Sequence, residues 1–129
     1  MNLEGFKFTK DHEWVKVDGD VAVIGITDYA QKELGDVVYV ELPSAGEVFK
    51  KGDACSNIES VKAVSDIYAP VSGEIIEVNK DLEDKPEIVN QDPYGAGWIL
   101  KIKITDLNEI EELLGDEKYK AYLKGISKE

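Results

Sequence analysis

Residues 57–70 read Asn-Ile-Glu-Ser-Val-Lys-Ala-Val-Ser-Asp-Ile-Tyr-Ala-Pro, and this stretch predicts a β-hairpin whose two turn residues are Val61 and Lys62. Side chains alternate between the two faces of a strand, so the hairpin has one face that can lie on a core and one that stays wet. The core-side face carries Ile58, Ser60, Ala63 and Ile67. The wet, acidic face carries Asn57, Glu59 and Asp66. Lys62 is predicted to project from the tip, away from both faces.

The composition indicates one folded domain without the features of a nucleic-acid-binding or membrane protein. The chain has 129 residues, 43% of them hydrophobic, and a net charge of −12 from 27 acids and 15 bases. All the bases are Lys, so the Arg forks and basic patches typical of nucleic-acid recognition are missing. No apolar run is long enough to cross a bilayer, and the N-terminus lacks a signal-peptide core. These features predict a soluble cytoplasmic protein.

Many short strands joined by turn residues predict antiparallel sheets packed face to face. Strands are expected at 6–8 and 14–17, and Asp18-Gly19 is a strong turn before the partner strand at 20–27. Thr27 or Asp28 should cap a short helix through Leu34, which Gly35 ends. Further strands are expected at residues 37–42, 47–50, 71–78 and 97–104. Residues 79–96 read as a loop.

Single residues add a few further expectations. Cys55, the only cysteine, is predicted to be a small buried side chain, so any redox chemistry needs a cofactor. His12 has no second His or Cys nearby, which argues against a metal site. In the 71–78 strand Val71, Ile75 and Ile76 are expected to face inward, and Gly73 is expected to mark a bend or bulge.

The tail changes to a helical period. The apolar residues expected on one helical face are Leu107, Ile110, Leu113 and Leu114, with Asp106 and Glu109 spaced as a capping pair. Asp116 is expected to cap a second short helix that runs through Tyr119, Tyr122 and Leu123 and is stopped by Gly125. Both helices are predicted to cover the end of the sheets.

Three sequence blocks resemble the H protein of the glycine cleavage system, a lipoyl carrier. They are Asp-His-Glu-Trp-Val (11–15), Glu-Ser-Val-Lys-Ala (59–63) and Asn-Gln-Asp-Pro-Tyr-Gly-Ala-Gly-Trp (90–98), and they occur in the order of that family. Biotin carriers instead have Met on both sides of their lysine. The resemblance implies a mainly β fold, a lipoyl-domain-like barrel-sandwich hybrid of two antiparallel sheets. It also implies a single carrier domain over residues 1–129, with a core at 12–104 and a helical cap at 105–125.

What the resemblance implies about function is a carrier without catalytic residues. Lys62 would carry lipoate through an amide, while Glu59 and Gly73 match positions that the attaching enzyme recognises. We nominate Glu13 and Asp66 as the acidic residues of a groove that would hold the lipoyl arm. The implied partners are glycine decarboxylase, aminomethyltransferase, dihydrolipoamide dehydrogenase, and a lipoate-protein ligase or lipoyl/octanoyl transferase, all acting on a monomer.

Three alternatives stay open at this level. Lipoyl domains of 2-oxoacid dehydrogenases are usually shorter and carry Asp before the lysine, where this chain has Val61. A carrier of the same fold could serve another pathway, such as sulfur metabolism. The third alternative is an adaptor β-sandwich in which Lys62 stays an unmodified, solvated turn residue, Glu13, Glu59 and Asp66 are surface charges, and Gly73 serves only the sheet.

Overall fold

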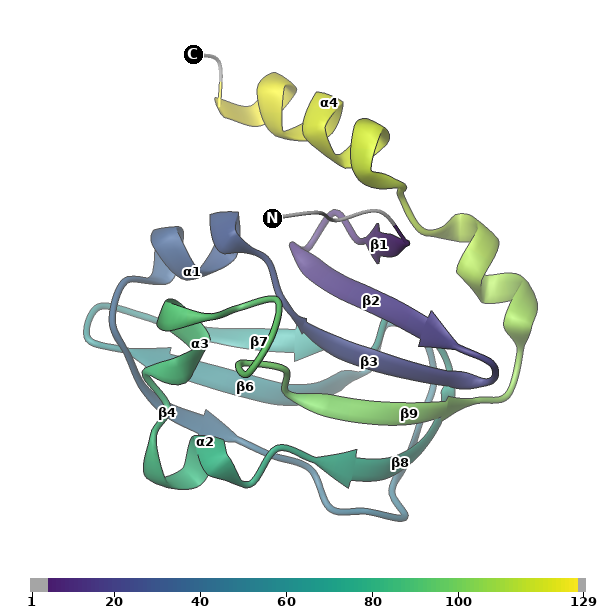
Figure 1. Cartoon of the computed structure of the whole chain (residues 1–129), viewed down its shortest axis with the longest axis horizontal. Coiled ribbons are helices and arrows are strands. Elements are labelled where there is room, and N and C mark those ends of the chain that lie inside the picture. Colours follow the sequence, from purple (N-terminus) through teal and green to yellow (C-terminus); the bar gives the residue numbers. More distant parts are fainter. Residues whose placement is uncertain (1–4, 128–129) are drawn as a thin grey trace.

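The computed structural model describes residues 5–127 and folds them into two antiparallel β-sheets flanked by short helices (Figure 1). The larger sheet has the order β1 (Phe6–Phe8), β2 (Glu13–Asp18), β3 (Val21–Ile26), β9 (Leu100–Ile104), β8 (Gly73–Val78) and β5 (Val48–Phe49). The smaller sheet has the order β4 (Val37–Glu41), β6 (Ala54–Ser60) and β7 (Val64–Tyr68). The predicted mainly β, two-sheet barrel-sandwich fold is confirmed.

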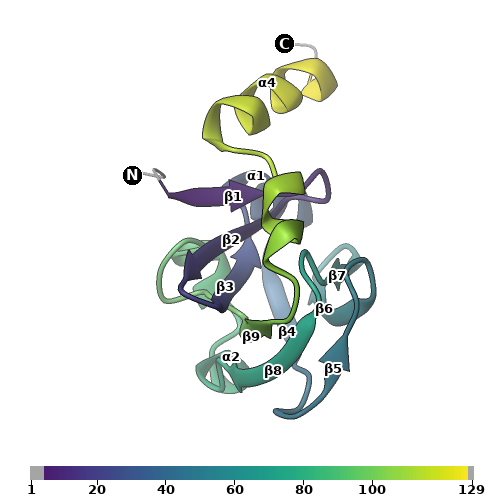
Figure 2. The same ribbon diagram turned by 90° about the vertical axis from the view of Figure 1, so that its right-hand side faces the viewer.

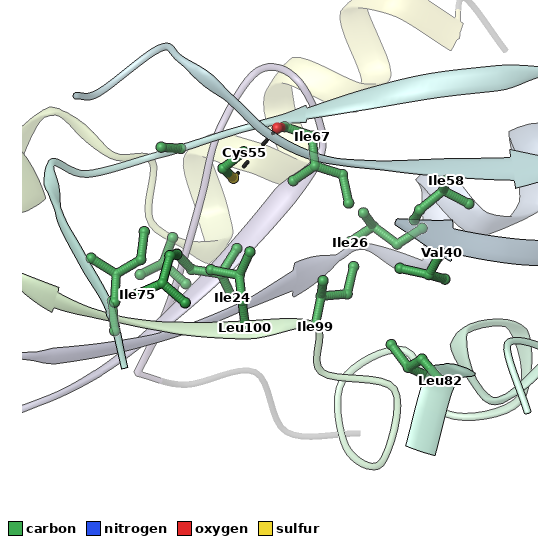
Figure 3. Close-up of a cluster of buried hydrophobic side chains, with 14 of the residues drawn as sticks. Ile24, Ile26, Val40, Cys55, Ile58, Ile67, Ile75, Leu82, Ile99 and Leu100 are labelled. Carbon is green, nitrogen blue, oxygen red and sulfur yellow. Dashed lines mark hydrogen bonds between the residues drawn. The ribbon is translucent and has the colours of Figure 1, made fainter. Parts of the chain in front are cut away.

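The main core lies where the inward faces of the two sheets meet (Figure 3). Side chains of β3, β8 and β9, such as Ile24, Ile75 and Leu100, are fully buried, and Ile58 and Ile67 cover them from the smaller sheet. Each such side chain stabilises the fold by about 1.5–3 kcal/mol through burial. The core therefore holds the β6–β7 hairpin by one face and leaves its turn outside.

Cys55 is a buried member of this core, as predicted. Its Sγ donates a hydrogen bond to the Ile67 carbonyl oxygen at 3.5 Å, the dashed line of Figure 3. Burial, reinforced by the nearby carboxylate of Glu13, raises the pKa of the Cys55 thiol to about 12. The thiol is therefore protonated at neutral pH and behaves as a small apolar side chain rather than as a nucleophile.

A second, aromatic cluster joins the N-terminal strand to the C-terminal helix. Phe8 stacks on Tyr119 of α4 (Asp116–Ser127) with ring centroids 4.6 Å apart, and Phe6 meets Trp14 edge-on at 5.2 Å. Figure 2 shows α4 beside β1, at the opposite end of the molecule from β5. β1 belongs to the larger sheet and its two Phe side chains are buried, so this cluster holds α4 against the edge of that sheet.

The predicted short helix is confirmed as α1 (Asp28–Leu34). Thr27 is its N-cap, and the Thr27 Oγ1 accepts a hydrogen bond from Ala30 N at 3.2 Å. Gly35 ends the helix with φ +80°, ψ −158°, a backbone conformation open essentially to glycine alone. The helix therefore starts and stops where its capping residues stand in the sequence.

The interpretation of residues 79–96 as a loop is wrong, because they contain α2 (Asp81–Asp84) and α3 (Ile88–Gln91). Each helix is only four residues long and buries one apolar side chain, Leu82 in α2 and Val89 in α3. A single buried apolar residue gives no helical periodicity, so the sequence pattern could not reveal these helices. Tertiary burial alone makes these two turns helical.

In β8 the predictions for Ile76 and Gly73 are corrected. The register shifts between Ile75 and Glu77, and Ile76 at this irregularity is 42% exposed instead of facing inward. Gly73 pairs regularly with Phe49 and Ile104, so it marks no bulge. The structure requires glycine there because a Cβ atom would overlap the Lys103 carbonyl oxygen of the neighbouring strand.

The tail is helical but differs from the prediction in type and contacts. Residues Leu107–Glu112 form a 3₁₀ helix, η1, in which Leu107 is exposed, and α4 runs past Gly125 to Ser127. Asp106 caps η1, its Oδ1 accepting from Asn108 N at 3.0 Å. The Glu109 carboxylate instead accepts from Ser72 N at 2.6 Å and Ser72 Oγ at 2.9 Å. Glu109 thereby joins the tail to the start of β8.

Candidate functional site: the Lys62 hairpin and the adjacent acidic cavity

The β6–β7 hairpin has the register predicted from the sequence. Ile58 pairs with Ser65 and Glu59 with Val64, and the Ser60 N donates to the Ala63 carbonyl oxygen at 2.8 Å. Val61 and Lys62 therefore form the turn. The Ser60 Oγ also accepts from the Ala63 N at 3.1 Å and from the Lys62 N at 3.3 Å. These bonds inside the turn hold the lysine at a defined tip.

Lys62 is exposed, but its stem lies over the corner between α1 and β4. A Cβ atom on Gly35 would come within 3.4 Å of Lys62 Cε, and the Val61 N donates to the Asp36 carbonyl oxygen at 3.0 Å. Figure 1 shows the hairpin turn at the same end of the molecule as α1. The tip thus rests on a neighbouring segment rather than standing clear of the fold as predicted.

A cavity of about 280 Å³ opens beside this hairpin, between α1, the start of β2 and β7. Its apolar wall consists of Ile26, Ala30, Leu34, Ile58 and Ile67. Its carboxylates are Asp11, Glu13, Glu33 and Asp66. The structure therefore brings two of the predicted site residues, Glu13 and Asp66, into one cavity. Sequence reasoning missed Asp11 and Glu33, although Asp11 belongs to the Asp-His-Glu-Trp block that already pointed to Glu13.

Glu13 is buried, with 2% of its surface exposed, so it is not a surface charge. Its Oε1 accepts from Thr9 Oγ1 and its Oε2 from the Tyr68 N of β7, both at 2.8 Å. Burial outweighs these bonds and raises the Glu13 pKa to about 7. A carboxyl group with this pKa is poised to bind or release a proton near neutral pH. Asp66, in contrast, is exposed on the edge strand β7.

His12 completes the cavity wall in an uncommon backbone conformation, with φ +68°. Its Nδ1 lies 2.8 Å from the Tyr119 hydroxyl, which in turn lies 2.9 Å from Thr27 Oγ1. The ring also packs against Tyr29, with centroids 4.5 Å apart. Burial lowers the pKa of His12 and favours the neutral ring. Within residues 5–127 no group of three or more His, Cys, Asp or Glu side chains is placed to hold a metal ion.

The two positions predicted for ligase recognition lie apart. Glu59 is exposed on the outward face of the smaller sheet, between Tyr39 of β4 and Val64 of β7, and two residues before the turn. Gly73 is buried in the larger sheet, at the start of β8 and at the other end of the molecule from the hairpin turn (Figure 1). The structure groups Glu59 with Lys62 and does not group Gly73 with them.

Comparisons with known proteins point to one family. A family described as glycine cleavage H-protein matches residues 6–126. The glycine cleavage system H protein of Halothermothrix orenii is 53% identical over 127 residues, 98% of this chain and 99% of the relative. The probable glycine cleavage system H protein of Pyrococcus horikoshii is 61% identical over 126 residues, covering 95% and 92%.

A solved structure agrees with the sequence comparison. The crystal structure of a glycine cleavage system H protein from Mycobacterium marinum superposes with a TM-score of 0.83 at 41% identity, covering 91% of this chain and 94% of that one. The matches span all three sequence blocks, both sheets and the lysine hairpin. The chain belongs to the glycine cleavage H-protein family.

Proposed function

We propose that this chain is the lipoyl carrier of a glycine cleavage system, with lipoate attached to Lys62 by an amide. The observation that carries the proposal is the position of Lys62 at the tip of a hydrogen-bonded hairpin, beside a cavity lined by carboxylates. Family membership supports the same role. An exposed lysine at a tip can enter the channel of an attaching enzyme, which must remove a proton from the ammonium group before the amine can be acylated.

The residues around Lys62 fit a lipoyl arm. The arm is long and apolar up to its sulfur-containing end, and the cavity offers an apolar wall that includes Ile26, Leu34 and Ile67. When attached, the lipoyl group supplies the sulfur chemistry that accepts an aminomethyl group and a pair of electrons from glycine. Cys55 is buried and protonated, so it supplies no competing thiolate.

The chain's own residues would hold a cationic amine in the cavity and limit its contact with water. Glu13 is the central acid, since its position is set by Thr9 and by the backbone of Tyr68. Asp66 lies on the same cavity and would add a second negative charge. A nearby cation would lower the Glu13 pKa and favour its ionised form. An arm without a positive charge would give the buried Glu13 carboxylate no counter-ion, so its ionised form would not be stabilised.

The partners follow from this role and are part of the proposal. The carrier would serve glycine decarboxylase, aminomethyltransferase and dihydrolipoamide dehydrogenase in turn, as a cytoplasmic monomer made of a single domain and without catalysis of its own. A lipoate-protein ligase or lipoyl/octanoyl transferase would attach the group, and Glu59 beside the tip is the residue we expect it to contact. Gly73 would act through the shape of the sheet. In residues 5–127 no helix is both long enough and apolar enough to span a membrane.

Mass spectrometry of the protein from its native source tests the proposal. We expect intact mass to show one lipoyl adduct and peptide mapping to place it on Lys62. An adduct on another lysine, or a biotin adduct, would contradict the proposal, and an unmodified chain would favour the adaptor alternative. The neighbouring genes would separate a glycine cleavage carrier from a carrier for 2-oxoacid or sulfur metabolism.

A further inference from the structure

The hairpin tip that presents Lys62 is supported by the corner that links α1 to β4, residues 35–37. Three contacts join the two segments. The Val61 N donates to the Asp36 carbonyl oxygen at 3.0 Å, the Lys62 stem lies over Gly35, and Val37 pairs with Ser60. Because these contacts bracket the turn, the position of the corner decides the position of the tip.

The regular hydrogen bonds of helix α1 and of the β4–β6 pairing do little to hold residues 35–37 in place. Gly35 leaves the helical conformation, with φ +80°, and the pairing of β4 with β6 is irregular between Val37 and Tyr39. The Gly35 carbonyl oxygen and the Val37 N are backbone groups at this irregular point, and buried backbone groups need partners. A residue from another element supplies both partners.

That residue is Asn90 of α3. Its Oδ1 accepts from the Val37 N at 2.8 Å, and its Nδ2 donates to the Gly35 carbonyl oxygen at 2.9 Å. The same Nδ2 also donates to Gln31 Oε1, in the middle of α1, at 3.0 Å. One amide group therefore spans the corner from both sides, because its oxygen accepts from the Val37 N while its nitrogen donates to the Gly35 carbonyl oxygen.

We propose that Asn90 is a positioning residue for the lipoyl lysine: it holds the 35–37 corner, and the corner holds the hairpin tip from which Lys62 is presented to the attaching enzyme. The inference rests on the proposed function. It also gives a physical role to the first residue of the 90–98 block, which lies far from Lys62 in the sequence. Without Asn90 the tip would still form through Ser60, but its orientation on the fold would be loose.

The test compares two matched substitutions, Asn90→Asp and Asn79→Asp. Asn79 uses the same chemistry elsewhere, its Nδ2 donating to the carbonyl oxygens of Ala96 and Trp98 at 2.8 and 2.7 Å. Asp keeps the size of Asn but replaces the donor by an acceptor. Both variants should therefore lower the melting temperature, and only Asn90→Asp should loosen the hairpin. If Asn90→Asp does not fold, Asn90→Ala, which adds no charge, gives the same comparison.

Two measurements are made on each protein. The first is amide hydrogen exchange at Val61 in the unmodified chain, which we expect to speed up by about three- to tenfold in Asn90→Asp, the range set by one net hydrogen bond. The second is lipoylation by a lipoate-protein ligase with lipoate and ATP. Its KM for the carrier should rise by a similar factor with kcat unchanged, because the ligase must order a looser tip.

The outcomes separate the inference from the function on which it rests. If the unsubstituted chain is not lipoylated, the proposed function fails. If it is lipoylated, the inference is overturned when either measurement in Asn90→Asp equals that of the unsubstituted chain, or when Asn79→Asp shifts both measurements equally. Changes in both measurements that are confined to the Asn90 variant support it.

Discussion

Replacing Glu13 by Gln should make the unmodified protein much more stable at pH 8 and only slightly more stable at pH 5. The structure raises the Glu13 pKa from 4.5 to about 7, because burial penalises the charged form. Gln keeps the shape and can still accept from the Tyr68 N, and its amide can donate to the Thr9 Oγ1. The substitution therefore removes the charge while it keeps both hydrogen-bonding positions.

The sign follows from proton linkage. Between pH 4.5 and about 7 the folded state keeps the Glu13 proton that the unfolded chain loses, so stability falls as the pH rises through this window. At about 1.4 kcal/mol per pH unit, the full effect is about 3 kcal/mol above pH 7. The Glu13→Gln variant has no carboxyl group to ionise at this position. Its free energy of unfolding, relative to that of the unsubstituted protein, should therefore grow between pH 5 and pH 7 and then level off.

The assay is urea unfolding of both proteins at pH 5, 6, 7 and 8, with free energies of unfolding extrapolated to water. His12, whose pKa is lowered by burial, is present in both proteins, so its contribution cancels in the difference to first order. Glu59→Gln is the control, because Glu59 is an exposed carboxylate and its removal should give a small difference at every pH. A Glu13→Gln difference that is the same at pH 5 and pH 8 would refute the argument.

Three further outcomes are expected. Lys62→Arg should keep the melting temperature, with a change in stability under roughly 0.5 kcal/mol, and should abolish lipoylation; an adduct on the folded variant would show that another lysine is modified. Glu59→Ala should melt like the unsubstituted protein but be lipoylated more slowly by the cognate ligase, and an unchanged rate would mean that the shape of the hairpin suffices. Gly73→Ala should lose at least about 1–3 kcal/mol of stability in a denaturant melt, because its Cβ would meet the Lys103 backbone; an unchanged midpoint would show that the strands can move apart.

The local elements could be predicted because their signals are local. The hairpin register around Lys62 follows from alternation, and the ends of α1 follow from Thr27 and Gly35, whose side-chain chemistry and backbone freedom act within a few residues. The family could be recognised from three short blocks, because these blocks are read without knowing how the chain brings them together. On these points the residues themselves carry the information.

Other features were decided by contacts between distant segments. α2 and α3 exist because Leu82 and Val89 are buried, Ile76 turns outward at a register shift, and Gly73 is required by a neighbouring strand. None of these constraints has a period or a motif, because the atoms that impose them come from elsewhere in the chain.

The site divides in the same way. The sequence by itself determined that Lys62 stands at a turn, and it offered Glu13 and Asp66 as candidate acids of a groove. Only the tertiary structure decided that Glu13 is buried with a raised pKa, that Asp11 and Glu33 share its cavity, and that Asn90 reaches the corner under the lysine. Burial and a pKa depend on everything that surrounds a group in space, and a sequence lists only what precedes and follows it.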